Sequence, residues 1–313
     1  MTRPLVSASV AVPLAERYRD RLPLAPGAEI VTLGEGSTPL LPAPRLSERT
    51  GAELWLKWEG ANPTGSFKDR GMTVAVSQAL ADGARSIVCA STGNTAASAA
   101  AYAARAGLEA VILQPEGAVA RGKLAQARVA GAKMEVRANF EEALAEAKDL
   151  EARGTHVLVN SLNPLRLEGQ KTAAFEIAEE LGGAPEVLAL PYGGGGNLCA
   201  YALGFREESA GMPRLLAAEA SDRAGTAASA IRIVEPAHQA DVERALAESA
   251  GEVASVSDEA ILGAWRLLAR EEGLFCEPSS AAGLAALLAD PPTGARVVCV
   301  ITGHGLKDPD AVE

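Results

Sequence analysis

Aromatic residues make up only 4% of this 313-residue chain, and its four cysteines stand far apart. Because Phe, Tyr and Trp are scarce, the core must be packed mainly from Ala, Leu and Val. Cys89, Cys199, Cys276 and Cys299 form no Cys-x-x-Cys pair and mostly have apolar neighbours, which predicts buried thiols rather than disulfides or a zinc site. No apolar run is long enough to cross a bilayer, and the first residues lack the apolar centre of a secretion signal. We therefore expect a cytoplasmic protein.

Positive charge is also in short supply. The chain has 29 lysines and arginines against 40 acidic residues, for a net charge of −11. This balance argues against nucleic acid or an anionic membrane as a partner. It is still compatible with an anionic small-molecule substrate, since screening over about 8 Å leaves nearby groups in control of a site.

Strand-length apolar runs alternate with helix-length segments from Ser86 onward, which predicts βαβ units and an α/β fold with parallel-type sheets flanked by helices. The predicted strands are 54–58, 87–90, 110–113, 134–136, 156–159, 187–190, 214–218 and 297–301. The predicted helices are 72–80, 95–106, 119–130, 140–152, 166–181, 197–205, 258–272 and 279–289. Residues 1–50 are rich in proline and predict an extended segment with short helical pieces, whereas much of 206–257 shows no clear period.

The stretch Asn62–Gly71 is the one around which we expect the chain to be organised. It lies between a predicted strand and a predicted helix, with Ser66 as a plausible helix cap. Lys68 then falls in the first helical turn, where the helix dipole and unpaired N–H groups lower the pKa of an amine. A neutral lysine amine attacks carbonyls and is the usual anchor of pyridoxal phosphate. The competing interpretation is a solvated surface lysine; a P-loop is excluded because Ser66-Phe67 stands where Lys-Ser/Thr is required.

Three further turns follow predicted strands, at the sheet edge where parallel α/β folds bind ligands. The first is Ser91-Thr92-Gly93-Asn94-Thr95, whose hydroxyls, amide and helix start can bind a carboxylate or can form an ordinary helix cap. The last is Thr302–Pro309, where Thr302 offers a hydroxyl at a strand end and His304 is more simply explained as a structural residue.

The second of these turns is Gly193-Gly194-Gly195-Gly196-Asn197. Consecutive glycines allow backbone N–H groups to converge on a phosphate. A dinucleotide fingerprint is the rival interpretation, with Glu219 at a suitable distance, but it needs a glycine where Leu198 stands. A single phosphate group is therefore favoured over pyrophosphate.

A polar cluster, Asn160–Lys171, precedes and opens another predicted helix. Within it, Arg166 could bind a phosphate or carboxylate with its two-pronged guanidinium group. A salt bridge to a neighbouring acid is the alternative.

Taken together, these blocks resemble the threonine synthase family, pyridoxal-phosphate enzymes of fold type II in the tryptophan synthase β-like superfamily. The resemblance runs from about Gly34 to Pro309. Its most specific parts are Asn62–Met72, Ser91–Ser98, Asn160–Thr172, Arg270–Ala282 and Thr302–Pro309.

The resemblance implies a role for each candidate residue. Lys68 would bind the cofactor covalently and then shuttle protons. Asn94 would bind the cofactor's phenolic oxygen, the Gly193–Asn197 backbone its phosphate, and Thr302 would face its pyridine nitrogen. Ser91, Thr92 and Thr95 would lie on the side of the substrate's carboxylate and phosphate, and Asn160, Ser161 and Arg166 would hold the substrate's phosphate.

The implied reaction converts O-phospho-L-homoserine and water into L-threonine and phosphate, with no metal. The implied architecture is a homodimer whose subunit has a small domain, 61–160, inserted into a large domain made of 1–60 and 161–313. Two alternatives stay open: a serine/threonine dehydratase on the same scaffold, which the four-glycine turn favours, and a nucleotide-binding protein without catalysis, built on the glycine turn and Glu219.

Overall fold

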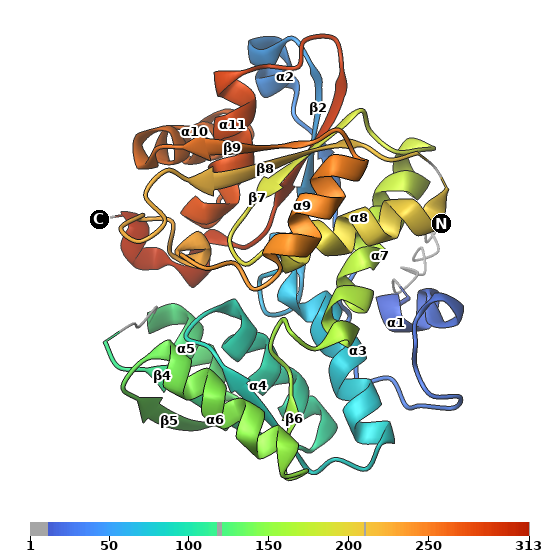
Figure 1. Ribbon diagram of the computed structural model, residues 1–313. Coiled ribbons are helices and arrows are strands. Elements are labelled where there is room, and N and C mark those ends of the chain that lie inside the picture. Colours follow the sequence, from blue (N-terminus) through green and yellow to red (C-terminus); the bar gives the residue numbers. More distant parts are fainter. Residues whose placement is uncertain (1–11, 118–120, 210, 313) are drawn as a thin grey trace, which may run out of the picture.

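A computed structural model describes residues 12–117, 121–209 and 211–312 and contains two sheets, one above the other in Figure 1. The larger sheet has the strand order β1-β2-β10-β7-β8-β9, and all its neighbouring strands are parallel except β1 and β2. Its strands are β1 (Leu40–Pro42), β2 (Glu53–Trp58), β7 (Val187–Pro191), β8 (Arg214–Ala220), β9 (Glu252–Val256) and β10 (Arg296–Ile301). The smaller sheet is entirely parallel, in the order β5-β4-β3-β6. Its strands are β3 (Ser86–Ala90), β4 (Glu109–Pro115), β5 (Lys133–Arg137) and β6 (Val157–Leu158).

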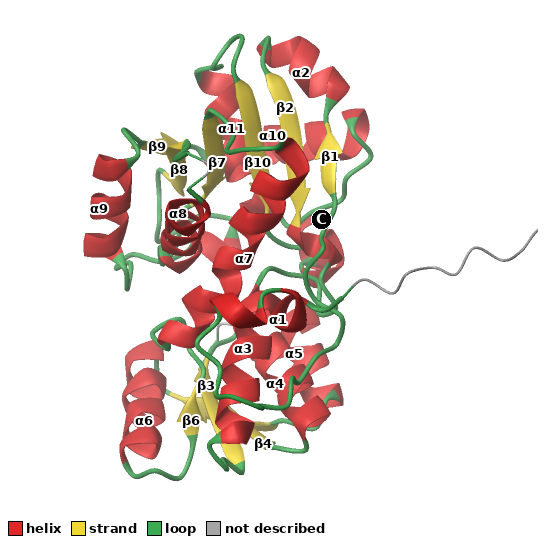
Figure 2. Cartoon of the chain, turned by 90° about the vertical axis from the view of Figure 1, so that its right-hand side faces the viewer, coloured by secondary structure: helices red, strands yellow, loops and turns green. Residues whose placement is uncertain are grey.

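Helices cover both sheets, and two of them connect the sheets (Figure 2). The helices near the larger sheet are α2 (Pro44–Thr50), α8 (Gly196–Glu208), α9 (Gln239–Glu248), α10 (Asp258–Glu271) and α11 (Ala282–Ala289). Those near the smaller sheet are α4 (Asn94–Ala106), α5 (Arg121–Val129) and α6 (Phe140–Ala152). Helices α3 (Lys68–Ala81) and α7 (Pro164–Leu181) pack on each other where the two parts meet, beside the short α1 (Leu14–Arg17).

The predicted α/β fold with parallel-type sheets flanked by helices is confirmed, and each predicted strand is present. The predicted helix 119–130 begins among residues outside the described part, and α5 covers 121–129. The segment without clear periods contains α9 and β9, which sequence periodicity missed. The proline-rich segment lies partly outside the described residues; from residue 12 it holds α1, β1 and α2 separated by irregular chain.

The prediction that Ser66 caps α3 is wrong. The N-cap residue is Phe67, and no side chain caps this helix. Ser66 instead pairs with Gly303 in an isolated β-bridge, and its hydroxyl is buried without a hydrogen-bond partner. Tertiary pairing with the end of β10 therefore replaces the local cap.

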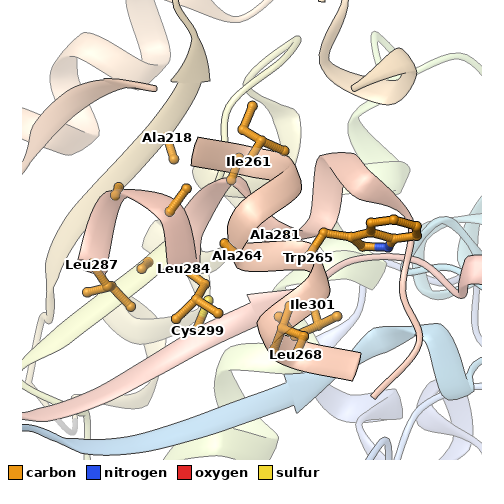
Figure 3. Packing of buried hydrophobic residues seen from close by; sticks show 14 of the residues in the cluster. Ala218, Ile261, Ala264, Trp265, Leu268, Ala281, Leu284, Leu287, Cys299 and Ile301 are labelled. Carbon is orange, nitrogen blue, oxygen red and sulfur yellow. The ribbon is translucent and has the colours of Figure 1, made fainter. Parts of the chain in front are cut away.

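The core is built largely from small aliphatic side chains, as composition predicted. Figure 3 shows α10 and α11 against one face of the larger sheet, where Ile261, Leu268 and Leu284 pack with Cys299 and Ile301. All four cysteines are buried and free, in agreement with the prediction of buried thiols. Within the described residues no cluster of His, Cys, Asp and Glu is suited to a metal ion, and no helix there is long and apolar enough to span a membrane.

Glycines bring α3 and α7 unusually close together. A Cβ atom added to Gly169 of α7 would lie 2.0 Å from the carbonyl oxygen of Arg70, and one added to Gly71 of α3 would lie 2.4 Å from that of Arg166. Neither position tolerates a methyl group without separation of the helices. The first turn of α3, which carries Lys68, is thus held directly against α7.

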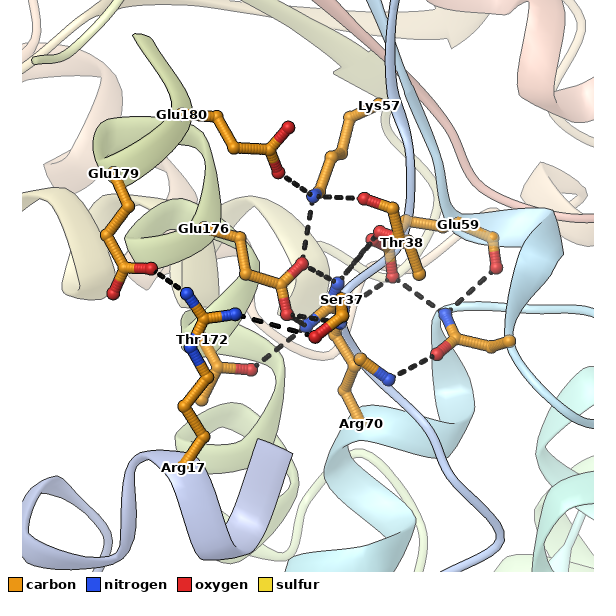
Figure 4. A network of polar contacts seen from close by, with 12 residues as sticks. Arg17, Ser37, Thr38, Lys57, Glu59, Arg70, Thr172, Glu176, Glu179 and Glu180 are labelled. Carbon is orange, nitrogen blue, oxygen red and sulfur yellow. Dashed lines mark hydrogen bonds and ion pairs between the residues drawn. The ribbon is translucent and has the colours of Figure 1, made fainter. Parts of the chain in front are cut away.

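A buried ionic network fixes the same turn of α3 (Figure 4). The guanidinium of Arg70 contacts Glu59 at 2.7 Å and Glu176 at 2.6 Å, and Lys57 lies 2.8 Å from Glu176. All four side chains are at most 1% exposed. Burial acts to raise the pKa of Glu176, but the charges of Arg70 and Lys57 hold that pKa well below its usual range. The network therefore links β2, α3 and α7 through two buried cations and two buried anions.

We predict that Gly169→Ala separates α3 from α7, lowers the free energy of unfolding by about 1–3 kcal/mol and displaces Lys68. Gly263→Ala is the matched control, because Gly263 lies in α10 and an added Cβ would meet no atom within 4 Å. It should be neutral or stabilise by up to about 1 kcal/mol. Urea unfolding of both variants makes the comparison; equal effects would contradict the close helix contact.

Candidate active site

Lys68 lies beside the carboxyl edge of the larger sheet. Strands β2, β10 and β7 are adjacent and parallel, so the segments that follow them leave the sheet on the same side. These segments are the Lys68 turn (Asn62–Gly71), the Thr302 turn (Thr302–Pro309) and the glycine turn (Gly193–Asn197). Since neighbouring strands are about 4.8 Å apart, the ends of β2 and β7 are separated by roughly 10 Å.

The Lys68 turn and the Thr302 turn are joined directly. The N–H of Phe67 donates to the carbonyl of Thr302 at 3.1 Å, next to the Ser66–Gly303 bridge. The Thr302 hydroxyl lies 2.9 Å from that of Ser280, so its position is fixed by a second hydroxyl. These contacts place Thr302 directly across from Phe67, the neighbour of Lys68.

The surroundings of Lys68 disfavour its charged form. Burial, followed by the positive charge of Arg166, lowers the pKa of Lys68 to about 7. Cys89 and Glu277 act in the opposite direction. Its Nζ lies 4.3 Å from the centroid of the Phe67 ring, and the residue as a whole is partly exposed. A substantial fraction of the amine is thus neutral at pH 7.

Arg166 supplies that charge from a buried position. Its Nη1 donates to the carbonyl of Val159 at 2.6 Å and its Nη2 to the carbonyl of Lys68 at 3.3 Å, while Nε is buried without a partner. Neither hydrogen bond involves an acidic side chain, and among the described residues Arg166 forms no salt bridge, so the structure does not support the salt-bridge alternative. Burial lowers the pKa of Arg166 to about 10, which still leaves it cationic at neutral pH.

Asn160 and Ser161 form the turn before α7. The Asn160 amide makes two hydrogen bonds of 2.9 Å to the backbone of Ala90, one accepted and one donated, and so ties this turn to the end of β3. The carbonyl of Ser161 accepts a hydrogen bond of 3.0 Å from the ring of His238. This turn therefore lies between the two sheets.

Asn94 begins α4 at the carboxyl end of β3. Its Nδ2 donates to Glu277 at 2.7 Å, and its Oδ1 is buried without a partner. The other oxygen of Glu277 lies 2.6 Å from Nζ of Lys123, a lysine of α5 that is 2% exposed. An amide, a carboxylate and an amine from separate segments thus meet beside the Lys68 turn.

Ser91, Thr92 and Thr95 are partly exposed around the same helix start. The Ser91 hydroxyl accepts a hydrogen bond from the N–H of Gly93 at 3.1 Å. Gly93 is the N-cap residue of α4 and no side chain caps this helix. The hydroxyls therefore do not serve as the ordinary helix cap that the sequence left open.

The glycine turn has little room for side chains. A Cβ on Gly195 would lie 2.6 Å from Val242, and the residue has a φ of +89°, which favours glycine. A Cβ on Gly193 would lie 3.1 Å from Ile231. Helix α8 begins at Gly196, so its free N–H groups open onto this turn. The side-chain nitrogen of Asn197, Nδ2, is also buried and has no hydrogen-bond partner among the described residues.

Comparison with known proteins decides the family. A family model described as "Pyridoxal-phosphate dependent enzyme" matches residues 31–303. A threonine synthase from Halalkalibacterium halodurans is 48% identical over 95% of this chain and 90% of its own length. A threonine synthase from Mycobacterium leprae is 51% identical over 94% of this chain and 88% of its own length. The chain belongs to the threonine synthase family.

The dehydratases stand further from this chain than the threonine synthase family does. A solved structure of a threonine deaminase from T.th. is 29% identical, with a TM-score of 0.71 over 85% of this chain and 92% of that chain. It confirms the fold type II architecture. As a family member the chain is a pyridoxal-phosphate-dependent enzyme, which excludes a non-catalytic nucleotide-binding protein.

The residues present fit that cofactor. In the described part of the chain, buried side-chain atoms without a hydrogen-bond partner include Ser66 Oγ, Asn94 Oδ1, Arg166 Nε and Asn197 Nδ2, all within the motifs singled out from sequence. The glycine turn provides backbone donors, and a side chain at Gly193 or Gly195 would crowd its neighbours. The oxygens of a phosphorylated ligand can accept hydrogen bonds from the donors among these groups, Ser66 Oγ, Arg166 Nε and Asn197 Nδ2.

Sequence reasoning missed several residues that shape the site of this threonine synthase family member. Glu277 was quoted within a motif without a role, although its carboxylate binds Asn94. Ser280 fixes Thr302, and Arg223 contacts the carbonyl of Gly193 at 3.4 Å. Ser280 lies in a recognisable motif, whereas only tertiary structure brings Arg223 to the glycine turn.

We predict that Lys68→Ala abolishes the yellow colour of the cofactor-bound protein and lowers turnover by at least about 100-fold. Lys148→Ala is the control, because Lys148 is an exposed lysine of α6. Absorbance spectra after incubation with pyridoxal phosphate and removal of the excess distinguish the two. Retained colour in the Lys68 variant would show that another lysine anchors the cofactor.

Proposed function

We propose that this enzyme converts O-phospho-L-homoserine and water into L-threonine and phosphate. The observation that carries the proposal is an amine of lowered pKa, on Lys68, beside the buried guanidinium of Arg166 and at the same sheet edge as the glycine turn. The threonine synthase relatives, about half identical over most of the chain, support this substrate. The reaction needs one anion site for the cofactor and another for the substrate, and the chain offers candidates for both.

The cofactor would be held by Lys68, Asn94, Thr302 and the turn Gly193–Asn197. Backbone N–H groups of Gly193, Gly194, Gly195 and Gly196, with Asn197, would bind its phosphate at the start of α8. Asn94 would donate to its phenolic oxygen. Thr302, a neutral hydroxyl held by Ser280, would face its pyridine nitrogen. When bound, pyridoxal phosphate withdraws electrons from the substrate's amino-bearing carbon and so makes the adjacent protons removable.

The substrate would be held from both sides of the Lys68 turn. Ser91, Thr92 and Thr95, at the start of α4, would orient its carboxylate. Asn160, Ser161 and Arg166, at the start of α7, would bind its phosphate. Arg166 is already cationic and close to Lys68, so it would also stabilise the negative charge of the leaving phosphate.

Lys68 would move the protons. Formation of threonine requires loss of a proton from the α-carbon and from the β-carbon, and loss of phosphate from the γ-carbon. A proton is then added at the γ-carbon to form the methyl group, and another returns to the α-carbon. Water supplies the hydroxyl at the β-carbon, and its remaining proton leaves with the phosphate. A base with a pKa near 7 can accept and return protons at neutral pH, which an ordinary lysine cannot do efficiently. Because burial and the charge of Arg166 lower its pKa, Lys68 would be able both to remove a proton from the substrate and to return one.

We also propose that residues 61–160 form a small domain inserted into a large domain of 1–60 and 161–313. The smaller sheet, whose strands lie between residues 86 and 158, supports this division. The homodimer and the cytoplasmic location stay predictions from the sequence.

One assay tests the proposed function. The purified enzyme with pyridoxal phosphate should release equimolar phosphate and threonine from O-phospho-L-homoserine, with little 2-oxobutyrate from threonine. Predominant formation of 2-oxobutyrate from threonine would instead identify a dehydratase.

We predict that Arg166→Ala raises the KM for O-phospho-L-homoserine at least about tenfold or lowers turnover similarly, because a charge-assisted contact to phosphate is lost. Cofactor binding, followed by absorbance, should persist. Arg128→Ala, at an exposed position of α5, should leave both unchanged. Should the Arg166 variant lose cofactor and substrate affinity to the same extent, Arg166 does not have the assigned role.

A further inference from the structure

His238 stands where two candidate phosphate sites approach each other. It is the N-cap residue of α9, in the segment whose role the sequence did not reveal. Its backbone N–H donates to the carbonyl of Gly194 at 3.1 Å, and its side chain is only 11% exposed. His238 is therefore packed against the glycine turn.

The imidazole of His238 reaches from the glycine turn to the turn before α7. Its Nε2 lies 3.0 Å from the carbonyl oxygen of Ser161. A carbonyl oxygen only accepts hydrogen bonds, so Nε2 must carry the proton. The other ring nitrogen, Nδ1, lies 3.6 Å from Asp241, which is about half exposed. The contact with Ser161 thus holds whether the ring is neutral or charged.

The glycine turn leaves the space that this ring occupies. A Cβ on Gly195 would lie 3.2 Å from Cβ of His238, and one on Gly196 would lie 3.5 Å from its Nε2 and 3.8 Å from Cβ of Ser161. A side chain at Gly195 would crowd His238, whereas a Cβ at Gly196 would meet the ring and Ser161 at ordinary contact distance. The run of glycines thus allows close backbone packing against His238 as well as access for a phosphate.

From this geometry we propose that His238 is a positioning residue that holds the Asn160–Ser161 turn at a fixed distance from the glycine turn, and so sets the separation of the substrate's phosphate from the cofactor's phosphate. The inference rests on the proposed function, which places these two phosphates at these two turns. His238 acts through the Ser161 carbonyl, so it orients the Ser161 backbone and hydroxyl without itself contacting the reacting atoms. The segment between β8 and β9 thereby contributes to substrate affinity.

The test compares His238→Ala with His238→Gln, since a Gln amide can still donate to the Ser161 carbonyl. With His238→Ala we expect the KM for O-phospho-L-homoserine to rise roughly five- to tenfold, as for one lost hydrogen bond. Turnover at saturation and the dissociation constant of pyridoxal phosphate should stay within about twofold of wild type, because the backbone contact to Gly194 remains. His238→Gln should recover most of the affinity. His156→Ala, in the smaller sheet's loop before β6, is the control.

Hydrogen exchange provides a readout that does not depend on activity. Peptides spanning residues 160–166 should exchange faster in His238→Ala than in wild type or His238→Gln, whereas peptides from β3 should not change. Unchanged exchange and unchanged KM in His238→Ala would overturn the inference, as would equal loss of cofactor and substrate affinity. A wild-type protein that does not act on O-phospho-L-homoserine would refute the proposed function, and the exchange data would then decide by themselves whether His238 holds the turn.

Discussion

The buried ion pairs of Arg70 with Glu59 and Glu176 hold the larger sheet, α7 and the Lys68 turn in one arrangement. Arg70 is two residues from Lys68 on α3, and its partners come from the segment after β2 and from α7. Removing one partner of such a buried pair typically costs about 3–5 kcal/mol, since it leaves an uncompensated charge. Lys57 balances the second acid, so two cations face two anions. The first turn of α3 is thus held both by the segment after β2 and by α7.

The chemistry of the site follows from that placement. With α3 held against α7, Lys68 lies near the guanidinium of Arg166, and burial together with this charge depresses the pKa of the amine. The same contact brings the turn before α7 close to the carboxyl edge of the larger sheet, where the glycine turn opens α8. Asn160 bonds the end of β3 to the turn before α7, and Asn94, which follows β3, bonds to Glu277. Turns that follow strands of both sheets therefore approach the start of α3, which carries Lys68.

Much of the fold and several candidate residues could be predicted from the sequence because they rest on local patterns. Strand–helix alternation indicated the parallel sheets, and glycine-rich or hydroxyl-rich turns after strands predicted candidate ligand sites, which stay predictions. Local patterns failed where contacts between residues far apart in the sequence determine the structure. Ser66 looks like a helix cap but pairs with Gly303. Glu277, Lys123 and His238 lie far in sequence from the turns they contact, and α9 and β9 lack clear periodicity. The depressed pKa of Lys68 was predicted from the helix start, whereas the structure assigns it to burial and Arg166.

The ionisation of Lys68 can be measured residue by residue. Its rate of acylation in the cofactor-free protein, followed by mass spectrometry as pH is varied, reports the fraction of neutral amine. Because the pKa is lowered from 10.5 to about 7, the rate at Lys68 should rise through a midpoint near pH 7 and level off above pH 8. Exposed Lys148 in the same sample should still be accelerating at pH 9. A midpoint for Lys68 near pH 10, like that of a solvated lysine, would contradict a pKa lowered by burial and by the charge of Arg166.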